Sequence, residues 1–128
     1  MNPDKDTVSV EADGIVEACR SLKEQSYVRL SFITAVDWYP GEPRFELVYS
    51  LHSFERNHWL RVKCRLGGHD PEIDSVTGVW RAADWYEREL FDLFGIRFRH
   101  HPDLRRILMP EGWEGHPLRK DYPLSGVR

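Results

Sequence analysis

The sequence predicts an α+β fold: a mainly antiparallel sheet with helices packed on one face, followed by an extended C-terminal arm. Apolar residues alternate with polar ones in three consecutive segments and recur at helical spacing in two others. The arm is predicted by its prolines, since four of the eight in the chain follow residue 95. The 128 residues form one structural domain by length, divided into an α+β core over 1–95 and a Pro-rich arm over 96–128.

The first helix is expected over residues 11–25, after a possible short strand at 7–10. Its apolar positions recur at the spacing of one helical face, with charged residues between them. The stripe consists of Ile15, Val16, Ala18, Cys19 and Leu22.

Three strands follow, over about 28–38, 44–51 and 59–66, and the short polar turns between them favour an antiparallel meander. In the second and third strands an apolar row alternates with a mostly polar one. In the third strand the polar row is Arg61, Lys63 and Arg65, beside Trp59. In the first strand every second residue except Thr34 is apolar, and we expect this row on a single face: Val28, Leu30, Phe32, Val36 and Trp38.

The second helix is expected from residue 75 or 79 to Phe94, with Gly95 ending it. At about 100° per residue its apolar side chains gather on one side. Charged residues occupy the other side: Arg81, Arg88, Glu89 and Asp92. Glu87 and Trp85 break the pattern, since Glu87 falls inside the apolar arc and Trp85 on the charged side.

A buried carboxylate costs several kcal/mol unless it is paired and hydrogen-bonded. We therefore expect Glu87 to pair with an arginine of the arm or of another subunit; the alternative is a partly hydrated position at the helix edge. A large aromatic residue on a charged helix face is typical of an interface, so Trp85 is predicted to contact a partner.

Composition excludes several classes of protein. The net charge of −3 gives no general attraction to nucleic acid or anionic membranes. The two cysteines, Cys19 and Cys64, have no metal-ligand spacing and are expected as buried thiols in a reducing compartment. No apolar run is long enough to span a bilayer, and the N-terminus has no signal-peptide pattern. The expected location is cytosolic, or peripheral on the cytosolic side.

No catalytic arrangement is evident. The sequence lacks a phosphate-binding glycine loop, a nucleophile elbow and a cysteine cluster for iron and sulfur, and Gly67-Gly68 reads as a turn. Glu87 and Glu89 point to different sides of the helix and cannot act as an acid–base pair. A metal site at His100, His101 and His116 is disfavoured because they lie in the Pro-rich arm; capping or packing, within the arm or against a partner, is the preferred role.

Residues 87–96, Glu87-Arg88-Glu89-Leu90-Phe91-Asp92-Leu93-Phe94-Gly95-Ile96, resemble the ERE-x-x-D-x-FGI stretch of the 30 kDa (C-type) subunit family of respiratory complex I. Residues 101–108 resemble its HPDLRRIL stretch, and residues 115–124 its GHPLRKDYPL stretch. Residues 33–37 and 45–51 are also similar to the first strands of that family. The resemblance covers nearly the whole chain.

The resemblance implies a non-catalytic structural subunit of the peripheral arm of NADH:quinone oxidoreductase, with no catalytic, cofactor or metal residues of its own. FMN, iron–sulfur clusters, NADH and quinone belong to the whole complex. The implied partners are the 49 kDa-like (D-type) subunit and neighbouring iron–sulfur subunits, at the cytoplasmic side of the cell membrane, with no nucleic acid and no membrane span. The residues expected to dock or to shape the motifs are Trp85, Glu87, Arg88, Glu89, Asp92, His101, Arg105, Arg106, His116, Arg119, Lys120, Asp121 and Tyr122.

Three other functions remain open from the sequence. One is the homologous subunit of a membrane-bound hydrogenase or of another quinone- or ferredoxin-linked dehydrogenase. The second is an RNA-binding module that uses the basic row of the third strand. The third is a small metalloenzyme that uses the three arm histidines.

Overall fold

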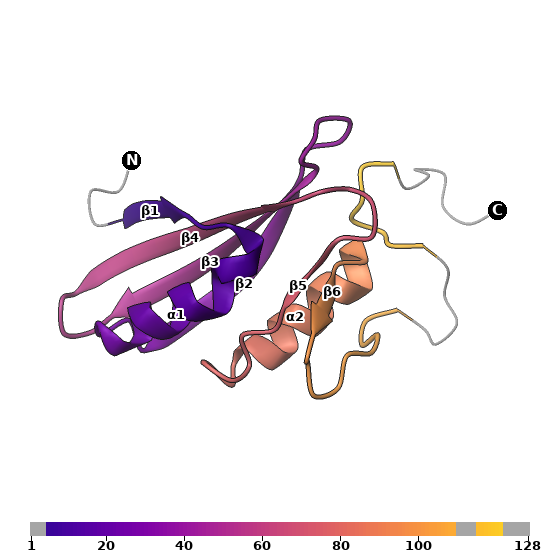
Figure 1. The fold of residues 1–128 in the computed structure, drawn as a ribbon. Coiled ribbons are helices and arrows are strands. Elements are labelled where there is room, and N and C mark those ends of the chain that lie inside the picture. Colours follow the sequence, from indigo (N-terminus) through magenta and orange to yellow (C-terminus); the bar gives the residue numbers. More distant parts are fainter. Residues whose placement is uncertain (1–4, 110–114, 122–128) are drawn as a thin grey trace.

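The computed structural model describes residues 5–109 and 115–121. The described chain forms six strands, one short 3-10 helix and two α-helices (Figure 1). In chain order they are β1 (Lys5–Ser9), η1 (Ala12–Gly14), α1 (Ile15–Glu24), β2 (Arg29–Asp37), β3 (Phe45–Ser53), β4 (His58–Leu66), β5 (Glu72–Asp74), α2 (Ala83–Phe94) and β6 (Arg97–Arg99).

The main sheet has four strands in the order β1-β4-β3-β2. β2, β3 and β4 form the predicted antiparallel meander, and β1 adds to β4 in parallel. The short strands β5 and β6 pair in parallel as a separate ribbon. The α+β class and the mainly antiparallel main sheet are therefore confirmed.

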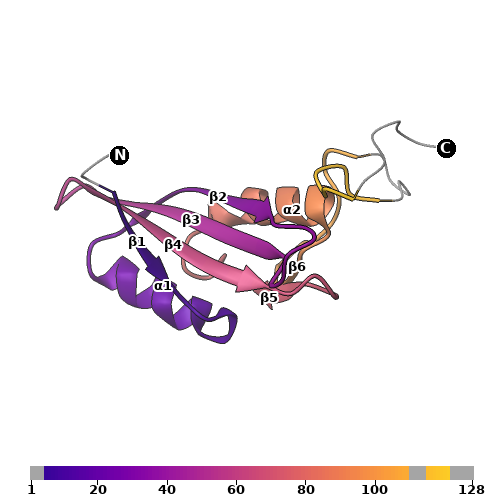
Figure 2. The same cartoon turned by 90° about the horizontal axis from the view of Figure 1, so that it is seen from above.

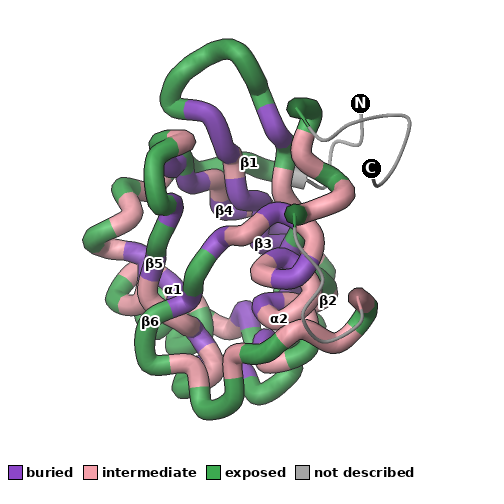
Figure 3. The backbone as a smooth tube through the Cα atoms, turned by 90° about the vertical axis from the view of Figure 1, so that its right-hand side faces the viewer, coloured by how far each residue is buried: buried purple, intermediate pink, exposed green. Residues whose placement is uncertain are grey.

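Both α-helices pack on the same face of the main sheet, and β2 and β3 pass in front of α2 when the molecule is seen from above (Figure 2). The core lies between this face and the helices. It joins Ile15 and Cys19 of α1, Leu90 and Phe94 of α2, and the alternating row of β3 that includes Tyr49. β3 is buried along nearly its whole length (Figure 3). Cys19 and Cys64 are buried free thiols, as the sequence predicted.

A β-bulge in β2 overturns the predicted facing of its residues. The register shifts between Leu30 and Phe32, so the residues facing the helices change from one parity to the other. Leu30 and Ile33 are buried, whereas Phe32, Val36 and Trp38 are exposed. Val28, which precedes β2, is exposed as well, so four of the five residues predicted to share the buried face lie outside the core. Phe32 and Val36 point to the opposite face of the sheet.

α2 begins later than predicted, at Ala83, because residues 72–82 form β5 and turns instead. It ends as predicted, with Gly95 in the left-handed conformation at φ +80°. Asp92 was expected on the charged, solvent side, and this is wrong: its side chain is fully buried. The core also continues into the predicted arm, since Ile96 and Phe98 are buried and β6 pairs with β5.

Candidate docking site

The last turn of α2 is held by residues of the arm. The final carbonyl groups of a helix have no partner within the helix and must be satisfied from outside. Here Arg106 and His116 both donate to the carbonyl oxygen of Asp92, at 2.8 and 2.9 Å. Leu118 donates its backbone N–H to Leu93, and Arg119 donates its Nε to Phe94 at 2.6 Å. Two arginines near the negative end of the helix dipole are also electrostatically favourable.

The carboxylate of Asp92 binds the first part of the arm. It accepts hydrogen bonds from Nε of Arg106 and from the backbone N–H groups of Ile107, Leu108 and Met109. Burial alone would raise the pKa of Asp92, but these donors outweigh it and lower the pKa below its usual value. Asp92 is thus an ionised, buried anchor. We call Asp92, Gly95, Arg106, His116 and Arg119, with the three backbone groups of 107–109, the helix-end cluster.

His116 is neutral in this cluster. Burial lowers the pKa of its ring, and the nearby Arg106 and Arg119 lower it further. Because Nδ1 faces a carbonyl oxygen, it carries the proton and donates it. Gly95 lies against this ring: a Cβ added there would be 2.8 Å from Cδ2 of His116 and 2.9 Å from Nη2 of Arg119. Glycine at 95 therefore both ends the helix and leaves room for the arm.

A second set of contacts holds the end of the described arm on the β2–β3 hairpin, which lies beside it (Figure 1). Arg44 binds Asp37 through Nε at 2.7 Å and Nη2 at 2.8 Å, and it also binds Asp121 at 2.9 Å. The backbone N–H of Lys120 donates to Oδ2 of Asp37 at 2.8 Å, the oxygen that also accepts from Nη2 of Arg44. We call Asp37, Arg44, Lys120 and Asp121 the hairpin cluster.

Charge pairing dominates the hairpin cluster. Burial works to raise the pKa of Asp37, but the hydrogen bonds from Arg44, Lys120 and Tyr39 lower it to about 2. Arg44 likewise lowers the pKa of Asp121. The guanidinium groups of Arg44 and Arg119 both lie over the ring of Phe45, at 4.9 and 5.4 Å from its centroid. This ring links the hairpin cluster to the helix-end cluster.

Glu87 is fully buried, but its partners are not those expected. It accepts hydrogen bonds from Oγ of Ser75 at 2.6 Å and from the backbone N–H of Val76 at 2.8 Å. The expected arginine partner is therefore not found in the described part of the arm; Arg106 binds Asp92 instead. Burial raises the pKa of Glu87 to about 7, although the two hydrogen bonds oppose this.

The beginning of the arm is fixed near Glu87 by His101. Its ring is fully buried, with Nε2 3.0 Å from a carboxylate oxygen of Asp84 and 3.9 Å from Glu87. Nδ1 accepts from the backbone N–H of Asp103 at 2.9 Å, so Nε2 carries the proton and donates to the backbone carbonyl oxygen of Asp84 at 3.2 Å. His101 therefore binds the first turn of α2, and His116 binds its last turn. No group of three or more His, Cys, Asp or Glu suited to a metal ion occurs among the described residues.

The remaining predicted residues stay nearer the surface. Trp85 is 49% exposed, with the guanidinium of Arg88 5.7 Å from its ring centroid. Arg88 also pairs with Asp84, Arg105 pairs with the exposed Asp103, and Glu89 is half-buried. Tyr122 lies outside the described residues.

The sequence analysis did not identify Asp37, Arg44 or the contact of Gly95 with the arm. The available signal was an acidic residue at the end of one strand and a basic residue just before the next strand, on the two sides of a Pro-Gly turn.

These contacts and the fold define a small α+β subunit whose C-terminal segment is bound onto its own domain. Residues 8–128 match the family of the 30 kDa subunit of respiratory-chain NADH dehydrogenase. The chain belongs to this family, and its function is that of the C-type subunit of NADH-quinone oxidoreductase, complex I. Within the complex it is a non-catalytic subunit of the peripheral arm, and members of the family in general carry no cofactor themselves.

Curated relatives support this at high identity. The chain is 53% identical over 126 residues to a C-type subunit of the NADH-quinone oxidoreductase of Rhizobium etli (strain CIAT 652), covering 96% of this chain and 67% of that protein. It is 50% identical over 121 residues to the corresponding subunit of Geotalea uraniireducens (strain Rf4), covering 94% and 74%.

Two solved structures are also similar. A trypsin-resistant fragment of Nqo5 matches with a TM-score of 0.72 and 31% identity, over 77% of this chain and 81% of that one. A chain of the membrane-bound sulfane sulfur reductase, an archaeal respiratory membrane complex, matches with a TM-score of 0.78 and 30% identity, over 97% and 75%. No helix in the described part of the chain is long and apolar enough to cross a membrane.

Proposed function

We propose that the arm and the exposed side of α2 form the surface by which this chain binds the 49 kDa-like subunit and neighbouring iron–sulfur subunits. The complex would hold the chain at the cytoplasmic side of the cell membrane. The FMN, the iron–sulfur clusters and the NADH and quinone sites would lie on other subunits, and this chain would hold its neighbours in position.

The observation that carries the proposal is that charged side chains of the arm are bound to the domain, whereas some of its apolar side chains are exposed. Three of its charged side chains, Arg106, Arg119 and Asp121, bind the chain's own domain. Two of its apolar side chains are exposed: Leu108 is 49% exposed and Leu118 is 53% exposed. Such a segment is held in place by its polar groups while its apolar groups stay exposed. It is preorganised for docking, because it loses little conformational entropy on binding.

The test is co-purification of the tagged chain with the other subunits from native membranes. Deleting all residues after Pro110 removes much of the arm and is expected to abolish co-purification. Because the deletion also removes His116 and Arg119, a point variant is needed. Leu118→Ser is expected to weaken co-purification while the isolated chain keeps its melting temperature.

The matched control is Val28→Ser, since Val28 is also 53% exposed but lies away from the arm. It should leave co-purification unchanged. Full assembly of both the truncated chain and Leu118→Ser would show that the arm is not a docking element. Oxidation of NADH by the purified complex separates complex I from a related hydrogenase or dehydrogenase, which would take electrons from another donor.

A further inference from the structure

The face of the main sheet opposite the two helices is not covered by any element of the described chain. β2, β3 and β4 present this face in register, with Val36 beside Glu46 and Glu46 beside Arg65. A sheet face that meets water is normally polar along its whole length. This face is not, because the bulge in β2 turns Phe32 and Val36 toward it, each 37% exposed.

Aromatic side chains border the face at two ends. Trp38, 47% exposed, lies at the hairpin end, where the guanidinium of Arg65 is 5.7 Å from its ring centroid. At the other end His52 packs between Trp59 and the exposed Phe54, with ring centroids 4.5 and 4.8 Å apart. Exposed apolar groups gathered on one surface mark an interaction site more often than scattered ones do.

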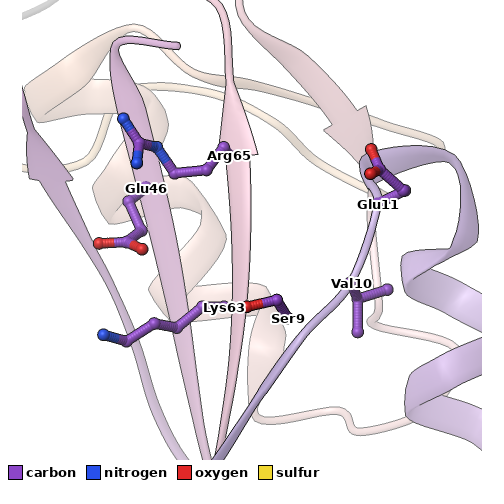
Figure 4. Close-up of a pocket in the computed structure, with 6 residues that line it drawn as sticks. All are labelled: Ser9, Val10, Glu11, Glu46, Lys63 and Arg65. Atoms are coloured by element: carbon purple, nitrogen blue, oxygen red, sulfur yellow. The ribbon is translucent and has the colours of Figure 1, made fainter. Parts of the chain in front are cut away.

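The face is also basic, in a chain whose net charge is −3. The charged residues that β2, β3 and β4 place on it are Glu46 and four cations: Arg29, Arg61, Lys63 and Arg65. Figure 4 shows Lys63 and Arg65 extending from β4 to the same side as Glu46 of β3. Glu46 already accepts a hydrogen bond from Nε1 of Trp38. Among the described residues, no carboxylate forms an ion pair with Arg29, Arg61 or Lys63.

We propose that this uncovered basic and apolar face of β2, β3 and β4 is a second docking surface, which binds an acidic segment of a neighbouring protein subunit. The inference rests on the proposed function and deepens it by naming a partner chemistry. The partner would bring carboxylates to the cations of β4 and apolar side chains to Phe32 and Val36 of β2. Complementary charge of this kind orients partners and disfavours wrong ones.

Two other occupants fit less well. A second copy of the chain would place two sets of these cations in one interface with only two glutamates, which is electrostatically unfavourable. Single-stranded nucleic acid needs free aromatic rings for stacking. Trp59 is half-buried against His52, and Arg65 is engaged with Trp38 and with the carbonyl of Pro43.

Thiol labelling tests whether the face is covered in the complex. Cys19 and Cys64 are buried, and burial raises the pKa of their thiols to about 12 and 11, so they react slowly. A Val36→Cys chain therefore has one accessible thiol. Its labelling rate is expected to fall about tenfold or more between the isolated chain and the purified complex, because interface cores exclude water. Glu17→Cys, at an exposed position of α1, is the control and should react equally in both.

Zero-length cross-linking identifies the partner's chemistry. The amine of Lys63 is expected to form an amide with an aspartate or glutamate of another subunit, and Lys63→Arg should abolish this link while keeping the charge. Cross-links within the chain also form in the isolated protein, so they are identified there and left out of the comparison.

The double variant Arg61→Glu, Lys63→Glu should reduce co-purification about tenfold. A tenfold loss of affinity corresponds to about 1.4 kcal/mol. The control reverses Arg20 and Lys23 instead, two exposed cations of α1 that lie outside both proposed docking surfaces.

The outcomes separate the two claims. If the wild-type chain does not co-purify with the oxidoreductase subunits, the proposed function and this inference both fail. If it co-purifies but Val36→Cys is labelled equally in both states, only the inference fails. A cross-link of Lys63 to a second copy, or protection that is lost on nuclease treatment, also overturns it.

Discussion

Glu87 and Asp92 lie on the same helix with fully buried side chains, yet their pKa values move in opposite directions. Asp92 receives an arginine and three backbone N–H groups, so its pKa is lowered. Glu87 receives one hydroxyl and one backbone N–H, so burial prevails and its pKa rises to about 7. Burial alone does not fix the charge of a carboxylate; the number and charge of its donors do. Of these two carboxylates, Asp92 is the one that accepts hydrogen bonds from the arm, and it has enough donors to stay ionised.

The largest expected effect follows from removing the charge of Asp92. Asp92→Asn leaves Arg106 without this carboxylate and turns an amide toward backbone N–H groups that need an acceptor. Breaking a buried pair of this kind costs about 3 kcal/mol or more. Chemical denaturation of the isolated chain should show this loss, and trypsin should cut faster at Arg105 and Arg106. Glu89→Gln, half-buried on the same helix, is the control and should change stability by less than about 0.5 kcal/mol. Equal behaviour of the two variants would remove Asp92 as an anchor.

Glu87→Gln should have a pH-dependent effect. Because the pKa of Glu87 is raised above its ordinary value of 4.5, the folded chain holds a proton that the unfolded chain releases between pH 4.5 and 7. Wild-type stability contributed by this residue is therefore present below pH 4.5 and is lost as the pH rises through 7. The Gln variant, which cannot ionise, should gain about 2 kcal/mol relative to wild type between pH 5 and pH 8. Denaturation curves at the two pH values measure this. A difference that does not change with pH would mean that Glu87 is ionised throughout.

Gly95→Ala tests the contact between helix end and arm. Alanine in the left-handed region costs about 1 to 2 kcal/mol, and its Cβ would also press on His116 and Arg119. The isolated chain should lose about that much stability, measured by thermal unfolding. Gly78→Ala is the control, because it has no atom within 4 Å of the added Cβ and should be nearly neutral. A neutral result for both variants would show that the arm does not lie against Gly95.

Trp85→Ala should have the smallest effect on the isolated chain. Trp85 is half exposed, and its ring faces the guanidinium of Arg88 on the same helix. The free energy of unfolding should change by less than about 1 kcal/mol, whereas co-purification with the other subunits should weaken. A large fall in melting temperature with assembly intact would place Trp85 in the core instead of at an interface.

Regular elements were predictable from this sequence because their signals are local. The alternation of β3 and β4, the end of α2 at Gly95 and the family motifs needed only neighbouring residues. The bulge in β2 was not predictable, because apolar residues of both parities occur on either side of it and tertiary packing decides which are buried. Asp92 was misplaced because its donors come from the arm, distant in sequence, and without them a carboxylate belongs in water. Asp37 and Arg44 lie only seven residues apart, so their pairing had a local signal, but their contacts with Lys120 and Asp121 come from the distant arm.

Amide hydrogen exchange at Ile107, Leu108 and Met109 in the isolated chain is the most direct test of the central claim, that the chain's own domain organises the arm before any partner binds. These N–H groups donate to the carboxylate of Asp92. They should exchange much more slowly than an unstructured peptide, and Asp92→Asn should abolish this protection while the amides of β3 keep theirs. Exchange at the unstructured rate in the wild-type chain, with β3 protected, would contradict the account.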